Sequence, residues 1–371
     1  MDFNLSDEQE LLRDTVARFI REEYSLDVRR ELCELSSGNS KLMWHRYAEL
    51  GLLSLCLPGD IGDFEFDFTD TVVVVEQLAC GCTIEPFVEN IVYAAEILKR
   101  CPTSLLRDKL LIDMADGRST VAVAHDDESE RLRGRKPVTE AAMESSGKIS
   151  ISGEKFMVLG ASSCDRLLVT ANIMGSHETA LIVVDSSLPG VRFNHYSLID
   201  DSSASDIVFE DVLVDGDSVI ARGEDVEAVI STANDKLVLA RMAEALGVME
   251  ASMSVTSEYV KERKQFGRSI AEFQSIQHAL ADMFVYVQAA RSIFFHSLSK
   301  IDCPKYERER AVSSAKYLIC RNGLLLTASA IQLHGGYGIT DEYMVSHFYK
   351  RMVLINLLCG DSSHHLSRMA R

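Results

Sequence analysis

A segment near the start of the C-terminal third carries polar residues suited to binding a phosphate group. Residues 263–283 read RKQFGRSIAEFQSIQHALADM. Arg263 offers a planar fork of donors that matches the oxygens of a phosphate or pyrophosphate, and Gln274 adds an amide. We interpret Phe266 and Phe273 in the same segment as packing residues. The segment therefore predicts a site for a phosphorylated ligand.

A second segment contains glycines that give a ligand access to the main chain. Residues 332–351 read QLHGGYGITDEYMVSHFYKR. Gln332 supplies a further amide, and Gly335 with Gly336 lets the backbone come close to a bound molecule. Each of these residues alone is commonly a solvated side chain or a helix C-cap. The prediction of a binding site therefore depends on both segments together.

The segment INLLCGDSS, residues 355–363, raises the question of proton transfer. A Cys359 thiol with the ordinary pKa of about 8.5 gives only a few per cent of thiolate at neutral pH. Burial among Leu357 and Leu358 would lower that fraction, so we prefer to interpret Cys359 as a structural thiol. Asp361, two residues further on, is the candidate for a base in this segment.

Two other groups of titratable residues invite a catalytic interpretation that we do not favour. His364 and His365 have no evident third residue to orient them, and we interpret them as a solvated or capping pair near a helix end. Glu244 and Glu250 lie on the first expected helix of the bundle, and at least one is expected to face solvent or to pair with Arg241 at helical spacing.

Composition indicates a folded protein with more than one domain. The chain has 371 residues, more than one hydrophobic core usually organises. Its 47% hydrophobic and 25% charged residues are typical of globular proteins and unlike disordered or fibrous chains. The formal net charge of −18 would repel a phosphate backbone, so no nucleic acid partner is expected.

The ends of the chain and its cysteines favour a cytoplasmic location. The N-terminal MDFNLSDEQELLRDTVARFI lacks the basic region and cleavage site of a signal peptide. No apolar run reaches about 18 residues, so no membrane span is expected. The nine cysteines are scattered and odd in number, as in reduced intracellular proteins. Cys80 and Cys82 lack a second ligand pair, so no metal is expected.

The periodicity of apolar residues changes twice and predicts three domains. Residues 1–117 have helical spacing, with a capping box at Ser6 and Gln9. Residues 118–222 alternate in short runs, which is typical of an antiparallel sheet or barrel. In residues 223–371 helical spacing returns and predicts a four-helix bundle. The expected fold class is therefore α+β.

The order of these domains and the segments 263–283 and 332–351 closely resemble the flavin-dependent acyl-CoA dehydrogenases. The match in order and spacing extends loosely over the entire chain. The resemblance implies a dimer, or a dimer of dimers, that shares each FAD between two subunits. The isoalloxazine ring lies in one subunit, and the adenosine and pyrophosphate end reaches the bundle of the neighbour. The residues implied at that end are Arg263, Gln265, Phe266, Gln274, Gln332, Gly335 and Gly336.

The chain departs from the family where the flavin ring would bind. Stretches that resemble TEPxAGSD and WITN in the family correspond here to VAHDDESER, residues 123–131, and KFMVLGA, residues 155–161. Added carboxylates would not stabilise an electron-rich reduced flavin, so we expect a degraded ring site. The residues that replace the family's donors are Asp126, Asp127, Met157 and Val158.

The carboxylate that abstracts the substrate proton in the family is also missing. In most members this carboxylate is the glutamate of a YEGT-like motif. The corresponding segment here is LCGD, and Cys359 takes the place of the glutamate. A minority of members carries the carboxylate at the position that is Leu237 in this chain. Asp361 and Asp235 lie two residues from these positions, and on a helix that offset turns a side chain about 200° away. We therefore predict no catalytic base in the usual places, with Asp361 as the candidate for a displaced one.

Together these features predict a subunit of a FAD-dependent acyl-CoA dehydrogenase that holds the adenosine end of FAD for a catalytic large subunit. It resembles the small subunits of bacterial α2β2 enzymes, which by analogy suggests steroid side-chain or other bulky acyl-CoA substrates bound by the partner. The resemblance also implies an electron-transfer flavoprotein as acceptor. Two alternatives stay open: a complete homo-oligomeric dehydrogenase that uses Asp361 or Cys359, and a flavin-free structural partner.

Overall fold

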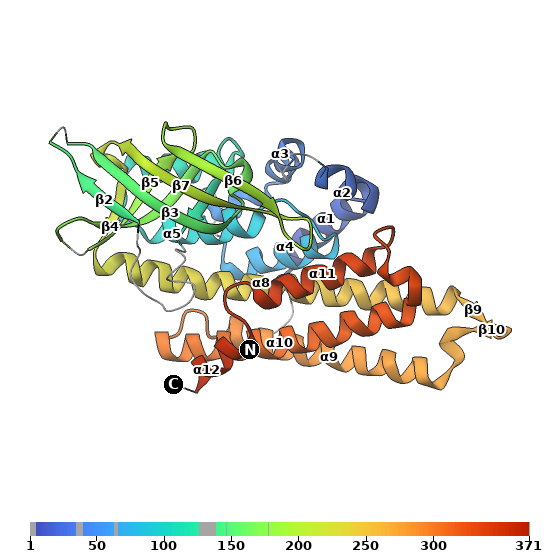
Figure 1. Cartoon of the computed structure of the whole chain (residues 1–371). Helices are drawn as coiled ribbons and strands as arrows, with labels where there is room; N and C mark the ends of the chain where they lie inside the picture. The colour runs from blue at the N-terminus through green and yellow to red at the C-terminus, as the bar shows by residue number, and fades with distance from the viewer. Residues whose placement is uncertain are drawn as a thin grey trace. The chain divides into compact units, whose positions relative to one another are not determined.

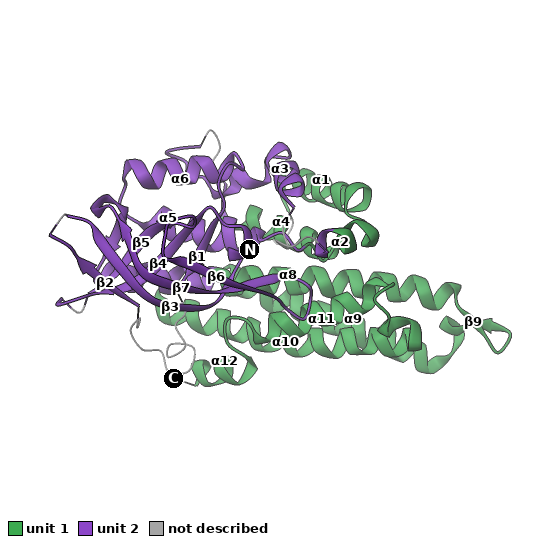
Figure 2. Ribbon diagram, turned by 45° about the horizontal axis from the view of Figure 1, so that its top comes forward, with its two compact units in different colours: residues 1–31, 68–83, 237–371 green, residues 32–67, 84–236 purple. Residues whose placement is uncertain are grey.

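The computed structural model describes residues 5–34, 40–62, 66–125, 139–145, 147–176 and 178–370. Figure 1 shows the elements along the chain, and Figure 2 colours two compact units. Unit 1 consists of residues 1–31, 68–83 and 237–371, and unit 2 of residues 32–67 and 84–236. The boundaries expected after residues 117 and 222 stay a prediction.

Unit 1 contains the helical bundle that the sequence predicts. Within it, α10 packs against α9 and α11. The long helix α8 begins in unit 2 and ends in unit 1, so its bounds span both. The helices that lie wholly or partly in unit 1 are α1 (Asp7–Glu23), α2 (Leu26–Cys33), α4 (Phe68–Cys80), α8 (Glu224–Glu262), α9 (Gln274–Leu298), α10 (Lys305–His334), α11 (Met344–Leu357) and α12 (Ser362–Met369).

Local sequence signals explain where these helices begin and how closely they approach. Ser6 Oγ accepts from Gln9 N at 3.2 Å, and Gln9 Oε1 accepts from Ser6 N at 3.2 Å, which confirms the capping box of α1. A Cβ on Gly247 would lie 2.0 Å from the carbonyl oxygen of Glu76. Only glycine therefore allows α8 and α4 to pack at this distance.

Unit 2 contains short helices and the sheet. The strands are β1 (Val121–Ala124), β2 (Glu140–Met143), β3 (Ile149–Leu159), β4 (Arg166–Ile173), β5 (Thr179–Asp185), β6 (Val191–Ser197), β7 (Ser203–Val214) and β8 (Val219–Arg222). The short helices are α3 (Lys41–Glu49), η1 (Leu52–Cys56), the π-helix η2 (Val88–Ala94), α5 (Ala95–Arg100), α6 (Leu105–Ala115), η3 (Ala161–Ser163) and η4 (Gly216–Ser218).

The sheet is mixed, so the prediction of an antiparallel sheet is wrong for two of its pairings. Its order is β6-β7-β3-β2-β4-β5-β8, with β1 also paired to β4. Both β1 and β2 run parallel to β4, and the other pairings are antiparallel. Parallel neighbours need a long connection, which the chain from β1 through β3 supplies before β4.

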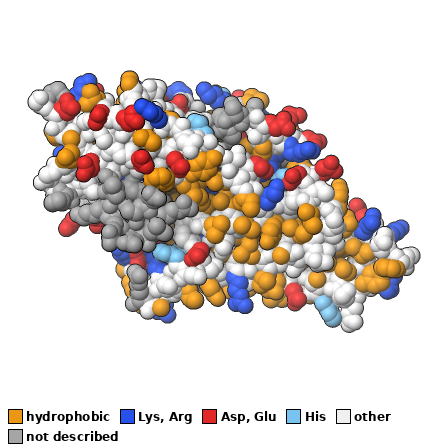
Figure 3. All heavy atoms as spheres, viewed as in Figure 1, with side chains coloured by type: hydrophobic (Ala, Val, Ile, Leu, Met, Phe, Trp, Pro, Cys, Tyr) orange, Lys and Arg blue, Asp and Glu red, His pale blue; other side chains and the backbone are white. Residues whose placement is uncertain are grey.

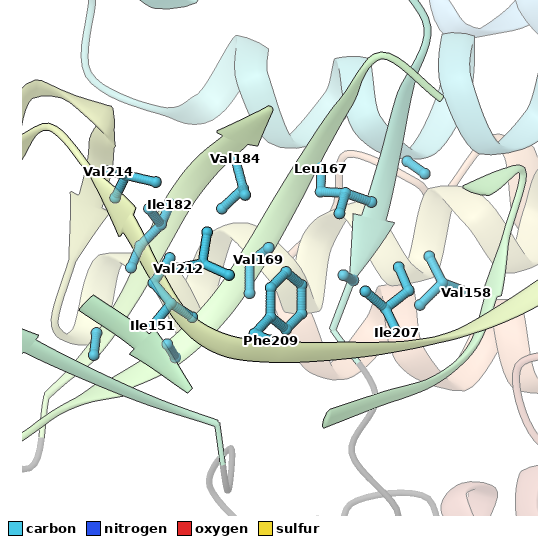
Figure 4. Close-up of a cluster of buried hydrophobic side chains, with 14 of the residues drawn as sticks. Ile151, Val158, Leu167, Val169, Ile182, Val184, Ile207, Phe209, Val212 and Val214 are labelled. Atoms are coloured by element: carbon cyan, nitrogen blue, oxygen red, sulfur yellow. The ribbon is translucent and has the colours of Figure 1, made fainter. Parts of the chain in front are cut away.

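One face of the sheet forms a hydrophobic core. Alternate residues Leu167, Val169 and Ala171 of β4 enter it, together with Ile207 and Phe209 of β7 (Figure 4). Each of the large side chains contributes about 1.5–3 kcal/mol through burial. The alternation that marked the strands in the sequence therefore corresponds to this core face.

Two further expectations concern the membrane and the cysteines. Within the described ranges, the search for a helix both long and apolar enough to cross a bilayer finds none. All nine cysteines are free thiols. A cytoplasmic location stays a prediction.

Candidate cofactor-binding site

A tight hairpin follows α8 and presents part of the first predicted segment. Its strands are β9 (Lys264–Gln265) and β10 (Arg268–Ser269), and Gln265 pairs with Arg268. The two residues between them, Phe266 and Gly267, have φ of 54° and 80°. Positive φ at both positions is what a two-residue type I′ turn needs, and glycine adopts it without strain.

Phe266 at the tip of this hairpin does not pack into the interior. Its side chain is 91% exposed, so our interpretation of Phe266 as a packing residue is wrong. Phe273, which follows η5 (Ile270–Glu272), meets Phe266 edge-on at 6.1 Å between ring centroids. The guanidinium of Arg268 lies 4.2 Å from the centroid of the Phe273 ring. The turn thus pushes Phe266 outward, while Phe273 is covered by its neighbours.

The second predicted segment forms the end of α10 and the turn η6 (Gly335–Ile339). Gly335 ends the helix with φ of 63°, a conformation that favours glycine. A Cβ on either Gly335 or Gly336 would meet no atom within 4 Å. No close packing among the described residues therefore requires Gly336, and the main chain of both glycines borders open space in this part of the structure.

The predicted polar side chains of the two segments share one property. Within the described ranges, each is exposed and forms no hydrogen bond or ion pair. The hairpin, the start of α9 and η6 lie at one end of the bundle, because Ile270 N donates to Arg263 O at 2.9 Å and Tyr259 of α8 contacts His334 of α10. The free polar side chains are those of Arg263, Gln265, Gln274 and Gln332.

The loop after α11 carries the residues considered for proton abstraction. Cys359 has φ of 59°, and Gly360 has φ of 92°. Asp361 is the N-cap of α12, and its Oδ1 accepts a hydrogen bond from His364 N at 2.8 Å. Asp361 is the candidate for a displaced base, and capping the helix occupies one of its carboxylate oxygens. Leu237 lies within α8 and brings no titratable group.

Two buried side chains hold this loop, and sequence reasoning did not find either role. Lys316 Nζ donates to Leu358 O at 2.8 Å and to Ile355 O. His365 Nε2 donates to Cys359 O at 2.9 Å, and His365 Nδ1 accepts from Ser313 Oγ at 3.1 Å. The helical spacing of Lys316 on α10 gave no signal for a contact with a residue so distant in sequence.

The prediction of a solvated or capping pair of histidines is wrong for His365. Its side chain is buried, whereas His364 is exposed. Burial lowers the pKa of His365 to about 4, against the opposing effect of its bond to Cys359 O. Because both ring nitrogens have partners inside the protein, His365 is placed to hold the loop rather than to transfer a proton.

The glutamates of α8 are also engaged. Glu244 is buried and accepts from Arg241 at 2.7 Å and from Arg351, which confirms the expected pairing with Arg241. Burial raises the pKa of Glu244, but the two guanidinium groups hold it below its usual range. Glu250 pairs with Arg291. Neither carboxylate is poised to accept a proton.

The stretch expected near the flavin ring belongs to unit 2. Met157 has φ of 52°, and its N donates to Asp206 Oδ1 at 2.9 Å. Val158 is buried within the core of the sheet (Figure 4), so it offers no polar group to a ligand. Asp126 and Asp127 lie outside the described residues.

Two sequence patterns of one family match most of the chain. The pattern named "Acyl-CoA dehydrogenase, N-terminal domain" matches residues 6–118, and "Acyl-CoA dehydrogenase, C-terminal domain" matches residues 230–371. The chain belongs to the acyl-CoA dehydrogenase family. The members of this family are oxidoreductases that use FAD for dehydrogenation.

Relatives of this acyl-CoA dehydrogenase family member match it along its length. A 3-(aryl)acrylate reductase of Clostridium sporogenes is 26% identical over 379 residues and covers 96% of both chains. The ChsE4–ChsE5 complex of Mycobacterium tuberculosis shares its fold with a TM-score of 0.88, at 24% identity over 100% of this chain and 98% of that one. The Tcur3481–Tcur3483 steroid ACAD has a TM-score of 0.86, at 23% identity over 98% and 97%.

The described residues fit one part of FAD better than the other. The donors Arg263 and Gln332 and the open main chain of Gly335 and Gly336 suit a pyrophosphate, which accepts hydrogen bonds and needs close backbone approach. In the stretch expected near the flavin ring, Val158 is buried in the core of the sheet. The chemistry of these donors therefore fits the adenosine and pyrophosphate end of the cofactor.

Proposed function

We propose that this chain is the small, non-catalytic subunit of a heteromeric FAD-dependent acyl-CoA dehydrogenase. In this proposal it binds the adenosine and pyrophosphate end of a FAD whose ring lies in a catalytic large subunit. One asymmetry carries the proposal. Side chains with free hydrogen-bond donors lie at the end of the bundle that contains Gly335 and Gly336. In contrast, we assign Cys359 to the position of the family's base. The nearby Asp361 and His365 already form hydrogen bonds within the chain.

The residues of this chain have binding roles in the proposal. When bound, FAD would accept the hydride that leaves the β-carbon of an acyl-CoA thioester. Arg263 would neutralise and orient the pyrophosphate through its planar fork, and Gln274 and Gln332 would donate amide hydrogen bonds. Gly335 and Gly336 would allow main-chain contact. The partner would bind the acyl-CoA and provide the base.

Exposed apolar side chains on the bundle support an assembly with another subunit. Phe284 and Val285 of α9 are 52% and 61% exposed, and Leu325 of α10 is 44% exposed. Figure 3 shows apolar side chains gathered over the bundle on the face in view. Apolar side chains gathered on a surface commonly mark a site of protein interaction. The fold shared with the ChsE4–ChsE5 complex agrees with a heteromer, which we propose to be an α2β2 tetramer.

The substrate and the electron acceptor are proposed by analogy. A subunit without its own acyl site leaves room in the assembly for a bulky acyl group, and a steroid ACAD shares this fold. We therefore propose a ring-bearing acyl-CoA such as a steroid side-chain thioester, and an electron-transfer flavoprotein as acceptor. A complete homo-oligomer is less well supported, because Asp361 caps α12 and the thiol of Cys359 is a weak base at neutral pH.

The test measures flavin per chain with and without a partner. The chain is purified alone and together with the product of a neighbouring dehydrogenase-like gene. One FAD per pair, and none for the chain alone, is the expected result. One FAD per chain for the isolated protein would establish the homo-oligomer instead. The absence of flavin from both preparations would support the alternative of a flavin-free structural partner.

Arg263→Ala should reduce FAD retention by the pair at least tenfold, because it removes the only planar fork proposed to meet the pyrophosphate. FAD affinity is measured by titrating the apo pair while following flavin fluorescence. Arg192→Ala is the matched control, since Arg192 is an exposed arginine of β6 that pairs with Glu210. Equal affinities for the two variants would remove the role given to Arg263.

A further inference from the structure

Four aromatic rings pack against one another at the turn η6, and those of Tyr259 and His334 are stacked. Tyr259 of α8 lies 4.2 Å from His334, and Tyr337 lies 4.6 Å from Tyr343, between ring centroids. His334 and Tyr343 join the two pairs at 5.1 Å. These separations are those of favourable ring contacts. We refer to Tyr259, His334, Tyr337 and Tyr343 as the aromatic cluster.

The aromatic cluster is tied to the main chain at the start of the turn. Tyr259 Oη donates to His334 O at 3.5 Å, directly before Gly335. His334 Nδ1 donates to Ala330 O at 2.8 Å, which fixes the ring against its own helix. A Cβ on Gly338 would lie 2.8 Å from the Cβ of His334, so the turn packs directly on this residue.

The end of the turn is held as well. Tyr337 O accepts from Thr340 N at 3.4 Å and from Thr340 Oγ1 at 2.9 Å. Ser346 Oγ of α11 donates to Thr340 O at 2.9 Å. A turn that contains Gly335, Gly336 and Gly338 would otherwise have great conformational freedom, so these bonds and the stacked rings together restrict it.

The burial of His334 is energetically unfavourable, because one of its ring nitrogens lacks a hydrogen-bond partner among the described residues. The side chain is buried, and within the described part of the chain its Nε2 has no hydrogen-bond partner. Burial lowers the pKa of His334, so the ring is neutral at pH 7 and stacks as an uncharged plane. A buried acceptor without a donor calls for an explanation, and the placement of the Gly335 main chain by this ring provides one.

We infer that the aromatic cluster positions the Gly335–Gly336 main chain for the nucleotide, with Tyr259 and His334 acting as positioning residues and not as ligands. This inference rests on the proposed function, which makes the turn a contact for the adenosine end of FAD. A turn already held in its binding conformation loses less conformational entropy on binding, so the cluster should strengthen FAD binding without touching it.

The test separates the ring of Tyr259 from its hydroxyl. Tyr259→Leu removes the stacked ring, whereas Tyr259→Phe keeps it and loses only the bond to His334 O. Amide hydrogen exchange of residues 335–340 is measured in the apo pair, and FAD affinity is measured by fluorescence titration. We expect Tyr259→Leu to speed exchange and to weaken FAD binding, each at least tenfold. Tyr259→Phe should stay within about threefold of the wild type in both.

A matched control and a second variant pair complete the experiment. Tyr349→Leu changes a half-buried tyrosine of α11 outside the cluster and should alter neither measurement. Should Tyr259→Leu not fold, His334→Phe, which keeps a ring, is compared with His334→Gln, which does not. Only His334→Gln should speed exchange and weaken binding.

Each outcome decides between the two claims. Unchanged exchange in Tyr259→Leu, or faster exchange with unchanged FAD affinity, would overturn the inference while the proposed function stands. A wild-type pair in which this chain makes no contribution to FAD binding, judged by Arg263→Ala, would instead overturn the proposed function.

Discussion

Lys316 and His365 both direct nitrogen atoms at main-chain carbonyl groups near the end of α11. Lys316 reaches Leu358 O and His365 reaches Cys359 O, so the segment that contains Cys359 is held by two side chains. Both side chains are buried, and neither has an open face toward a substrate. At the scale of single residues, the buried amine of Lys316 and the buried imidazole of His365 therefore have structural roles.

The pH dependence of folding follows from His365. Burial lowers its folded pKa to about 4, whereas the unfolded chain takes up the proton near about 6.5. The unfolded state therefore binds more protons between these values, and the free energy of unfolding falls as pH drops from about 6.5 to about 4. The loss from this residue is at most about 3.4 kcal/mol.

Urea unfolding at pH 7 and pH 4.5 checks this prediction with His365→Gln, whose stability should change less between the two pH values than that of the wild type. His364→Gln is the control, because His364 is exposed. A pH dependence that is the same in His365→Gln and in the wild type would contradict the prediction.

At the scale of elements, α12 begins with a capping carboxylate. The carboxylate of Asp361 caps the helix, and without it the free N–H groups of the first turn would lack this partner. The same carboxylate is the displaced base of the homo-oligomeric alternative. A structural and a catalytic role of Asp361 therefore predict different results for one substitution.

Asp361→Asn keeps a good capping side chain and removes the charge, so acyl-CoA oxidation by the pair should stay within about twofold of the wild type. Asp361→Ala removes the cap and should cost about 1 kcal/mol of stability, again without loss of activity. Initial rates with an artificial electron acceptor and urea unfolding are measured on both variants. Loss of activity in Asp361→Asn with unchanged stability would identify Asp361 as the base.

At the scale of the whole molecule, the sequence predicts what depends on local signals. The capping box of α1 and the end of α10 at Gly335 need only neighbouring residues, and the structure has both. The parallel pairing of β1 with β4 and the stacking of Tyr259 on His334 join residues far apart in the chain. No periodicity encodes such contacts, so the sequence indicated candidate donors, whose binding role stays a prediction, but not the contacts that position them.

The last prediction follows from the proposal that this chain does not catalyse dehydrogenation on its own. If the base were the single missing part, Cys359→Glu would restore dehydrogenation by the isolated chain. We expect no acyl-CoA-dependent reduction of an artificial acceptor by Cys359→Glu alone. In the stretch expected near the flavin ring, Val158 is buried in the core of the sheet and Met157 N is bonded to Asp206. The wild-type pair, assayed in parallel, is the positive control. Turnover by the isolated variant would mean that this chain can hold the flavin ring, and the division of labour proposed between two subunits would then be wrong.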